Sequence, residues 1–517
     1  MNVGRLLAQC AQRAPDKIAV IFGQEKLSFN QLNLMASRFA GKLRQLGIKK
    51  GDRVAIILPN SSSFTIAYFG ILKLGAIAAP LDIRLQGEDI RGIVKDAQIR
   101  VFITSSELNL SLAPFIKGID CLTATIITGI DGDTTRGSCI PFEEIVGDET
   151  LSGEIGVEVH ADDEALYLYT SGTTGRPKGV VLTFNNLRFF PETMEKLYGT
   201  TGSTITGCIL PMSHISGPIL CNELVDKQCS LVIFDRLRPD TILATVEKHK
   251  VTWFHAVPPI FQALLKVPHL TKYDLSSLRF IGMMGTAIPL TLLKDFKKTF
   301  PSVSVIQGYG LTETSPFITL VPLEYEQQKM GSIGAAVPHA EIKLVDEKGE
   351  EVPCGEAGEL IVKGPMVMKG YHNNPEATRD RIKNGWLYTG DLCRKDEDGF
   401  YYYLGRKDDM IIVGGLNVFP SEIESTLVSH PQVVEAAVVG VPDRERGEVI
   451  MAFVVVAPGF NLPEKELISF CRDRLVKYKV PKRIVLRDTI PKTSTGKIAR
   501  RLLADTSPGP SDSARTT

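Results

Sequence analysis

The sequence predicts an α/β protein whose large amino-terminal domain of parallel-type sheets carries a small β-rich subdomain and is followed by a smaller α+β domain. Between residues 53 and 283, short apolar runs alternate with helical patterns, which is typical of parallel sheets covered by helices. After about Gly331 the runs alternate in polarity, as in antiparallel strands. At 517 residues the chain exceeds the length that one hydrophobic core sustains, so at least two domains are expected.

The first elements follow from the spacing of apolar residues. From residue 29 to 46 these residues recur at steps of three and four, which predicts an amphipathic helix. Residues 53–60 predict a buried strand, followed by a helix to about Lys73 and a second apolar run at 76–80. Strand-like runs return at 100–104, 230–234, 251–256 and 278–283.

The carboxy-terminal part has a different pattern. Alternating runs at 359–363 and 399–404, with an Asp398-Gly399 pair suited to a hairpin turn, predict a small β-rich subdomain. Beyond Gly405 the pattern predicts a helix near 420–428, strands near 433–439 and 449–456, and a helix near 463–476. We therefore expect a large domain at 1–404, a hinge at 405–409, a small mobile domain at 410–505 and a disordered tail at 506–517.

Composition and charge exclude several classes of protein. Lys plus Arg and Asp plus Glu number 59 each, so the chain has no overall basic field for binding a nucleic acid backbone. The nine cysteines are scattered and never spaced as CxxC, which predicts reduced thiols rather than disulfides or a zinc site. The sequence shows neither a secretory signal nor the roughly 20 apolar residues that a membrane-spanning helix needs. We expect a soluble cytoplasmic protein.

One loop has the composition of a phosphate-binding loop. Residues 169–179 (YTSGTTGRPKG) follow an apolar strand and hold three glycines, four Ser/Thr hydroxyls and Lys178. Glycine lets backbone N–H groups approach phosphate oxygens, the hydroxyls donate hydrogen bonds, and the lysine adds a positive charge. The spacing is not that of a Walker P-loop, and taken alone such a run is more often a flexible loop.

This loop is the first of five motifs that follow one another along the chain. They are YTSGTTGRPKGV at 169–180, QGYGLTE at 307–313, YTGD at 388–391, GRKDDMIIVGGLN at 405–417 and PKTSTGK at 491–497. In this order they resemble the adenylate-forming superfamily of acyl-CoA synthetases, adenylation domains and luciferases, from about residue 28 to Lys497. The resemblance, which favours the fatty-acid–CoA ligase branch, implies an enzyme that uses ATP and Mg²⁺ to activate a carboxylic acid as an acyl-adenylate.

The resemblance assigns roles to individual residues. Glu313 matches a Mg²⁺-binding carboxylate and Thr312 a catalytic hydroxyl that contacts phosphate, and one carboxylate with substrate oxygens suits magnesium. Tyr309 matches the residue that stacks on adenine. Asp391, which can accept two hydrogen bonds, matches the residue that binds the ribose hydroxyls, and Arg406 also matches a nucleotide contact. The other residues expected at the nucleotide are Thr170, Ser171, Gly172, Thr173, Thr174, Gly175, Lys178, Gly285, Thr286, Ala287 and Gly310.

Three further assignments concern a movement of the small domain. Lys497 matches the catalytic lysine whose charge stabilises the transition state as the carboxylate attacks the α-phosphorus. Asp408 matches the hinge, because adenylation and thiol transfer need different domain arrangements. Gly415 matches a glycine past which the pantetheine of coenzyme A approaches, although a pair with Gly414 also suits a hairpin. Some relatives have an arginine in place of Asn417, so its phosphate contact is not carried over.

The acyl group is expected beside the segment 211–217 (PMSHISG). Here His214 matches a catalytic group that gates the pocket or orients the carboxylate, and a buried core histidine is the alternative. The windows 209–220, 280–288 and 308–317 are mostly apolar, with Glu313 as their single acidic residue. This favours an uncharged acyl group over an amino acid, whose ammonium needs a nearby acid.

We therefore expect an AMP-forming acyl-CoA ligase that takes ATP, Mg²⁺, coenzyme A and a carboxylic acid, with a medium- or long-chain fatty acid favoured. An enzyme that loads an acyl or aryl acid onto a carrier-protein phosphopantetheine shares these motifs and is the alternative. Neither reading includes nucleic acid or a transmembrane segment. The oligomeric state stays open, a homodimer included.

Overall fold

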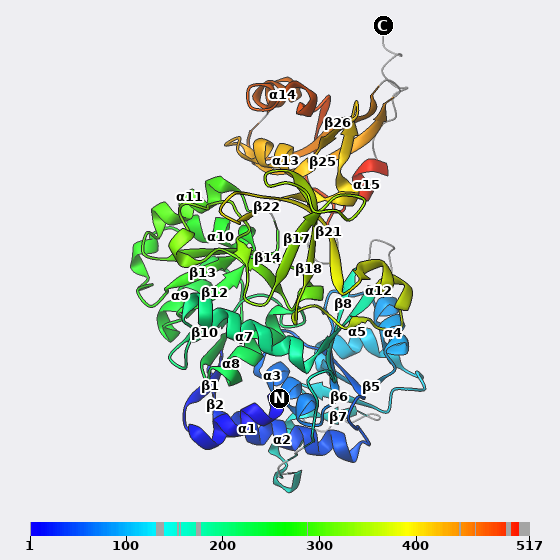
Figure 1. The fold of residues 1–517 in the computed structure, drawn as a ribbon. Coiled ribbons are helices and arrows are strands. Elements are labelled where there is room, and N and C mark those ends of the chain that lie inside the picture. The colour runs from blue at the N-terminus through cyan, green and yellow to red at the C-terminus, as the bar shows by residue number, and fades with distance from the viewer. Residues whose placement is uncertain are drawn as a thin grey trace.

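The chain folds into a large body with a smaller domain at one end, shown in orange and red in Figure 1. The computed structural model describes residues 2–130, 139–151, 153, 155, 157–171, 177–286, 288–443, 446–460, 462–492 and 498–505. It contains two large, mostly parallel sheets, a small antiparallel sheet, and a fourth sheet in the smaller α+β domain. The predicted fold class is confirmed.

The first large sheet has eight strands in the order β19-β9-β8-β4-β3-β5-β6-β7. Its strands are β3 (Arg53–Ile57), β4 (Ile77–Pro80), β5 (Ile99–Ser105), β6 (Ala124–Thr128), β7 (Cys139–Pro141), β8 (Glu164–Ser171), β9 (Pro177–Thr183) and β19 (Gly370–Tyr371). Strands β8 and β9 form an antiparallel hairpin, so the glycine-rich loop connects them, and β19 pairs antiparallel with β9. A segment some 190 residues further along the chain thus lies beside this loop's second strand.

The second large sheet has nine strands in the order β16-β15-β14-β13-β12-β10-β11-β1-β2. They are β1 (Ile18–Phe22), β2 (Glu25–Ser28), β10 (Ile205–Cys208), β11 (Ser230–Ile233), β12 (Trp253–Ala256), β13 (Phe280–Met283), β14 (Ser304–Gly310), β15 (Phe317–Leu320) and β16 (Ala335–Ala336). The six strands from β14 to β1 in this order are parallel. Their carboxyl ends therefore meet at one edge, where α/β proteins commonly bind ligands.

Helices cover both faces of each large sheet. The inner faces share one core with α1 (Val3–Arg13), α2 (Phe29–Gln45), α3 (Ser62–Lys73), α6 (Phe142–Gly147), α7 (Phe184–Tyr198) and α8 (Ser216–Asp226). The outer face of the nine-stranded sheet packs on α9 (Pro239–His249), α10 (Pro258–Leu265) and α11 (Leu290–Thr299). The outer face of the eight-stranded sheet packs on α4 (Gly87–Asp96) and α5 (Ser106–Ile116).

Local signals explain where the central helices begin. The Ser28 hydroxyl accepts the Gln31 backbone N–H, and the Gln31 side-chain oxygen accepts the Ser28 backbone N–H. These two bonds form a capping box at the start of α2. Ser61 caps α3 through the Phe64 backbone N–H. Helix α3 is buried along nearly its whole length, which explains the apolarity of this region. Within the described ranges, no helix combines the length and apolarity needed to cross a membrane.

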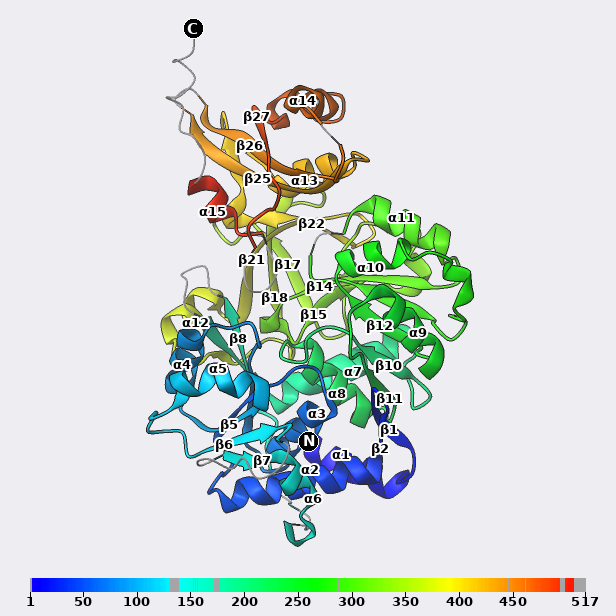
Figure 2. The ribbon, with the colours of Figure 1, turned by 180° about the vertical axis from the view of Figure 1, so that it is seen from behind.

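The predicted β-rich subdomain is an antiparallel sheet. It consists of β17 (Glu341–Val345), β18 (Ala357–Lys363), β20 (Ile382–Lys383), β21 (Trp386–Lys395) and β22 (Tyr401–Arg406), and α12 (Pro375–Arg381) precedes β20. The turn between β21 and β22 contains Asp398 and Gly399, as predicted. In Figure 2, β22 lies directly beneath the small domain.

The small domain has its own sheet and its own hydrophobic clusters. It contains β23 (Ile411–Val413), β24 (Leu416–Val418), α13 (Pro420–Val428), β25 (Val433–Asp443), β26 (Gly447–Val456), α14 (Glu464–Arg472), β27 (Arg483–Leu486) and α15 (Arg500–Asp505). A separate core is what an independently moving domain requires. The predicted tail at 506–517 lies outside the described residues.

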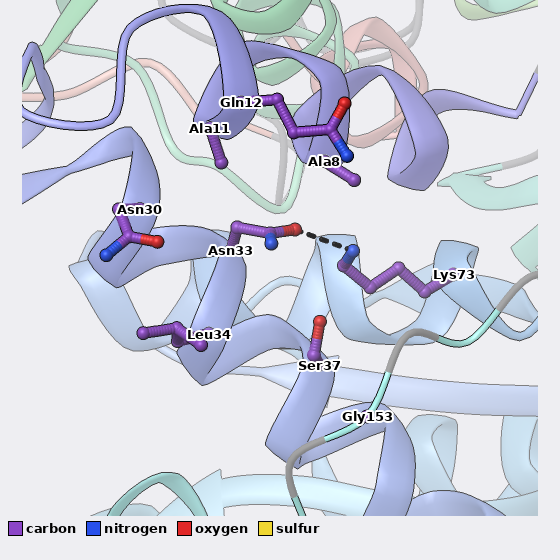
Figure 3. A pocket seen from close by; sticks show the side chains of 9 residues that line it. All are labelled: Ala8, Ala11, Gln12, Asn30, Asn33, Leu34, Ser37, Lys73 and Gly153. Atoms are coloured by element: carbon purple, nitrogen blue, oxygen red, sulfur yellow. Dashed lines mark hydrogen bonds between the residues drawn. The ribbon is translucent and has the colours of Figure 1, made fainter.

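A cavity of about 270 Å³ lies among α1, α2 and α3, far from the five motifs along the chain. Figure 3 shows Lys73 reaching into it, where its Nζ donates to Asn33 Oδ1 at 2.7 Å. Its lining includes none of the residues that the sequence assigns to the nucleotide. Residues predicted to bind the nucleotide lie instead near the carboxyl ends of the sheet strands.

Candidate active site

Several residues predicted to bind the nucleotide lie at strand ends of the two large sheets. Thr170 and Lys178 are paired across the β8–β9 hairpin, at the base of the glycine-rich loop. Gly285 and Thr286 follow the carboxyl end of β13, and Tyr309 lies near the carboxyl end of the adjacent parallel strand β14. The structure therefore places these predicted residues at strand ends. The remaining loop residues Gly172, Thr173, Thr174 and Gly175, the Ser171 side chain, Ala287 and Lys497 lie outside the described part of the chain.

Glu313 lies in a single turn of 3-10 helix, Thr312–Thr314, immediately after β14. The buried Thr314 hydroxyl accepts the Leu311 N–H at 2.8 Å and donates to the Pro316 carbonyl at 2.7 Å, which closes the turn. Thr312 and Glu313 remain partly exposed beside it. The turn therefore presents a hydroxyl and a carboxylate side by side, as the predicted phosphate and metal contacts require.

Gly310 is required here by a close backbone approach. A Cβ built at this position would lie only 1.7 Å from the Pro316 carbonyl oxygen. Any other residue would push apart β14 and the chain that returns after Glu313. The glycine in the GYG motif thus has a structural role in holding this turn, whatever contact it makes with a nucleotide.

Tyr371 contacts Glu313 and was not predicted from the sequence. Its hydroxyl donates to Glu313 Oε1 at 2.9 Å, and the Lys178 Nζ lies 5.6 Å from the centroid of its ring. Burial, and then the neighbouring carboxylate, raise the Tyr371 pKa well above its usual value, so the hydroxyl stays a donor. One side chain thus contacts both the predicted metal ligand and the lysine at the end of the glycine-rich loop.

The nucleoside side of the site centres on Asp391, whose side chain is 3% exposed. Asp391 and Arg406 are directly paired across β21 and β22, and Arg406 Nη1 lies 3.3 Å from Asp391 Oδ1. Tyr309 donates its hydroxyl to Asp391 Oδ2, and its ring stacks on Tyr403 at a centroid distance of 6.1 Å. The structure therefore brings together the residues predicted to bind adenine, ribose and nucleotide oxygens.

The charges in this cluster are mutually stabilised. Burial alone would lower the Arg406 pKa, but Asp391, together with smaller contributions from Tyr403, Tyr309 and Asp408, outweighs burial, so the pKa lies above its usual value. Burial, and then Asp391, raise the Tyr309 pKa well above its usual value. Arg406 is therefore a permanent cation and Tyr309 a permanent donor. Both hold Asp391 in a fixed orientation.

His214 is paired with Asp82, an acid that lies outside the sequence windows expected to line the acyl site. Its Nε2 lies 3.5 Å from Asp82 Oδ2, and Asp82 also accepts the Arg84 Nε–H at 2.9 Å. Burial opposes ionisation of Asp82, but the bonds from Arg84 and His214 lower its pKa well below the usual range. No acid occurs between Cys208 and Asn222, yet the fold supplies one from the segment that follows β4. His214 is 38% exposed, so it is not the buried core histidine of the alternative.

The predicted hinge residue lies between two anchors. Lys407 Nζ donates to Glu359 Oε2 of the β-rich subdomain at 3.2 Å. Asp409 accepts Arg500 Nη1 of the small domain at 3.1 Å. Asp408 between them is exposed. The ion pairs on its two sides therefore belong to different parts of the molecule.

Gly414 and Gly415 form the turn between β23 and β24, with φ angles of 56° and 81°. The predicted hairpin is therefore present, and both positions favour glycine. A Cβ built at Gly415 meets none of the described atoms within 4 Å. Gly415 therefore lies in a turn with open space beside it in the described part of the chain.

The donor set suits a magnesium ion that arrives with a nucleotide. In the part of the chain that the structure describes, no group of three or more His, Cys, Asp or Glu side chains could hold a metal by itself. Glu313 offers one partly exposed carboxylate, and Mg²⁺ commonly completes its shell with phosphate oxygens and water. Glu313 would hold the ion, which would neutralise phosphate charge, and Thr312 would contact the phosphate.

Comparisons with known proteins agree with this geometry. The AMP-binding enzyme family model matches residues 7–372, and the AMP-binding enzyme C-terminal domain model matches residues 422–497. A long-chain-fatty-acid–CoA ligase of Bacillus subtilis is 36% identical over 97% of this chain and 93% of its own length. A feruloyl-CoA synthase of Amycolatopsis is 33% identical, over 95% and 96%.

Solved structures are similar over the whole fold. The anthranilate CoA ligase AuaEII, in complex with anthranoyl-AMP, has a TM-score of 0.89 at 30% identity and covers 98% of this chain and 97% of its own. The o-succinylbenzoate coenzyme A synthetase of Bacillus subtilis, in complex with ATP and a magnesium ion, has a TM-score of 0.84 at 32% identity, with coverages of 96% and 98%. The chain belongs to the AMP-binding enzyme family and is an AMP-forming acid–CoA ligase.

Proposed function

We propose that this enzyme activates a medium- or long-chain fatty acid as acyl-AMP and then transfers the acyl group to the thiol of coenzyme A. The main support is the lack of free charge in the sequence windows expected around the acyl group, since the Asp82 carboxylate beside His214 is already bonded to Arg84. The windows 209–220, 280–288 and 308–317 contain no Lys or Arg, and Glu313 is their single acid. A dicarboxylic acid would need a cation for its second carboxylate, and an amino acid would need a free acid for its ammonium. Neither is present in these windows.

The proposed first step uses the residues described above. Lys178, Thr312 and the glycine-rich loop bind the phosphates. Glu313 would hold Mg²⁺, which would supply positive charge beside them. Asp391, Arg406 and Tyr309 fix the nucleoside end. The substrate carboxylate attacks the α-phosphorus and pyrophosphate leaves, with Lys497 supplying positive charge.

The second step requires the small domain to turn about Asp408. The thiol of coenzyme A attacks the acyl carbonyl and AMP leaves with the bonding electrons of the C–O bond. The support for a hinge is that Lys407 is anchored to Glu359 whereas Asp409 is anchored to Arg500, with exposed Asp408 between. We accordingly propose domains at 1–404 and 410–505, joined by residues 405–409.

A hydroxylated aromatic acid is a second candidate, favoured by one observation. On the inner face of β12, Trp253 Nε1 and His255 Nδ1 are buried without a hydrogen-bond partner among the described residues. Their rings stack at a centroid distance of 5.8 Å. Buried polar atoms usually have partners, and a ring hydroxyl at the far end of an acyl pocket would supply one.

A panel of carboxylic acids separates these candidates. Pyrophosphate release is measured for acids of 4 to 18 carbons and for hydroxylated cinnamic and benzoic acids, each with and without coenzyme A. The proposal expects the highest kcat/KM at about 8 to 16 carbons and formation of the CoA thioester. Higher kcat/KM for the hydroxylated aromatic acids, lost in His255→Phe, would replace it with the second candidate.

A further inference from the structure

We propose that Tyr371 is a positioning residue that fixes the Mg²⁺-binding carboxylate of Glu313 and the phosphate-binding ammonium of Lys178 relative to each other. The inference rests on the proposed roles of Glu313 and Lys178. It concerns a residue outside the five motifs, contributed by a strand of only two residues, β19. Three lines of geometry carry it.

The first line is the backbone of the segment 368–372, which connects two motifs. On one side, the Lys369 N–H donates to the Val181 carbonyl at 3.0 Å and the His372 N–H donates to the Gly179 carbonyl at 2.8 Å. On the other side, the Met368 N–H donates to the Glu313 carbonyl at 2.9 Å. This segment therefore binds the strand that leaves the glycine-rich loop to the turn that carries Glu313.

The second line is the Tyr371 hydroxyl. It donates to Glu313 Oε1 at 2.9 Å, and the Tyr371 N–H is itself held by the Thr378 hydroxyl at 2.9 Å. A carboxylate has two oxygens, and a hydrogen bond to one of them fixes the rotation of the group. Oε2 is then presented in a constant direction, which a magnesium ion with strict octahedral geometry requires.

The third line is the Tyr371 ring. The Lys178 Nζ lies 5.6 Å from its centroid, within the range of a cation–π interaction. The ring thus limits where the ammonium can lie, and the hydroxyl of the same side chain limits where the carboxylate can lie. Lys178 and Glu313 carry opposite charges and lie 135 positions apart in the sequence, and both contact the Tyr371 side chain.

Tyr167 provides a matched control. Its hydroxyl donates to Glu164 Oε2, it lies on β8 in the same sheet, and its side chain is also buried. Neither Tyr167 nor Glu164 belongs to the proposed nucleotide site. The Tyr167 ring lies 4.7 Å from the His372 ring, and Glu164 pairs with Lys369, so this pair also contacts the segment 368–372. Tyr167→Phe therefore repeats the chemical change of Tyr371→Phe beside the same segment without removing a bond to the Glu313 carboxylate.

The test is calorimetric titration of the full chain with ATP, in EDTA and at a series of Mg²⁺ concentrations. Tyr371→Phe keeps the ring and removes the hydroxyl. We expect its ATP affinity in EDTA to stay within about twofold, whereas the gain in affinity caused by Mg²⁺ falls about tenfold, as for a lost hydrogen bond to a charged group. Tyr371→Leu also removes the ring, and should in addition weaken ATP binding in EDTA.

Further measurements separate this inference from the proposed function. The Mg²⁺ concentration for half-maximal pyrophosphate exchange should rise in Tyr371→Phe and in Glu313→Gln, and stay unchanged in Tyr167→Phe. A normal Mg²⁺ response in Tyr371→Phe, with an altered one in Glu313→Gln, overturns the inference and leaves the metal assignment intact. A normal response in Glu313→Gln overturns both. Equal losses in Tyr371→Phe and Tyr167→Phe would show a general packing effect and also overturn it.

Discussion

The two ends of the nucleotide site are built in different ways. At the nucleoside end, Asp391 is nearly buried within a regular antiparallel pair of strands, and Arg406 and Tyr309 already hold both of its oxygens. At the phosphate end, Glu313 is partly exposed on a one-turn helix and is held by Tyr371, which comes from another sheet. At the first end a strand pair and one long-range bond from Tyr309 hold a buried carboxylate. At the second end the long-range bond from Tyr371 holds a carboxylate that lies on a helical turn rather than in a strand pair and stays partly exposed.

This difference follows from what each end must do. A ribose has fixed hydroxyls that a rigid carboxylate can match without rearrangement. The phosphates change their charge distribution during the reaction, and the pyrophosphate must leave. On the proposed hinge, Lys497 of the small domain can approach the phosphates for this step and withdraw afterwards. We therefore expect substitutions at the phosphate end to change rates and metal dependence, and those at the nucleoside end to change affinity.

The largest effect is expected for Lys497→Ala, which removes charge from the phosphate end. Carboxylate-dependent pyrophosphate exchange should fall at least about 100-fold, as for loss of a group that stabilises a transition state. Thioester formation from supplied acyl-AMP should remain. Lys492→Ala is the control, because Lys492 pairs with Glu435 at 3.0 Å within the small domain. Exchange within about threefold of the unmodified enzyme would contradict the role of Lys497.

The next largest effect is expected for Asp408→Pro, which tests whether the phosphate end needs a mobile domain. Proline fixes φ near −65° and restricts the preceding residue, so the small domain should stay in one arrangement. Pyrophosphate exchange should persist, whereas thioester formation falls about 10-fold to 100-fold and acyl-AMP accumulates. Asp408→Ala should keep both half-reactions. Equal loss of both in the proline variant would make the segment structural.

Gly415→Leu examines the same movement at the turn between β23 and β24. Exchange should be kept and thioester formation lost, as a side chain fills the proposed thiol path. Because Gly415 has a φ of 81°, leucine also strains the turn, and Gly414→Leu, with a φ of 56° in the unmodified chain, is the matched control. Normal thioester synthesis by Gly415→Leu would place the path of coenzyme A elsewhere.

A smaller effect is expected for Asp391→Asn at the nucleoside end. The variant keeps the shape of the side chain but leaves Arg406 without its ionic partner and weakens binding of the ribose. The KM for ATP should rise about 10-fold with little change in kcat or in Mg²⁺ dependence. If Mg²⁺ dependence changed together with the KM for ATP, the two ends would not be independent and the comparison above would fail.

The smallest effect on catalysis is expected for Glu223→Gln, a buried carboxyl outside both ends. Unlike Asp391, Glu223 bonds no arginine among the residues that the structure describes. Its Oε2 accepts the Thr206 hydroxyl at 3.1 Å, and burial raises its pKa to about 8. The folded state therefore binds a proton that the unfolded chain releases above about pH 4.5, and stability falls as pH rises toward 8. Glutamine does not ionise, so Glu223→Gln should not lose stability over this pH range. Its melting temperature should exceed that of the unmodified chain at pH 8 and equal it near pH 5, and its activity should be unchanged.

Much of the fold could be predicted because it depends on local pattern. The apolar spacing from residue 29 placed α2, and the run at 53–57 placed β3, since both elements are fixed by side chains that are neighbours in the sequence. The motifs likewise predicted Asp391 and Arg406, and the structure brings these two together.

The contacts that could not be predicted are those between distant segments. Tyr371 lies 58 residues from Glu313 on a strand too short to show any alternation, so nothing in the sequence indicated that it reaches the site. Asp82 was not predicted beside His214 because the two residues are far apart in the sequence. The fold brings Asp82 to His214 from the end of β4. Such pairings depend on how sheets assemble, which local periodicity does not determine.

The pair between Arg500 and Asp409 has a mechanical consequence. Arg500 also binds Glu424, at 2.6 Å and 2.8 Å, and Lys492 and Ile498 form a β-bridge across residues 493–497. The ends of the segment that contains Lys497 are therefore fastened to the same body as the turn at Gly414 and Gly415. On the proposed hinge, one rotation withdraws the lysine as it brings in the glycine turn. The two half-reactions then share a single degree of freedom, and a ligand that stalls this rotation at either extreme stops turnover without entering the acyl pocket.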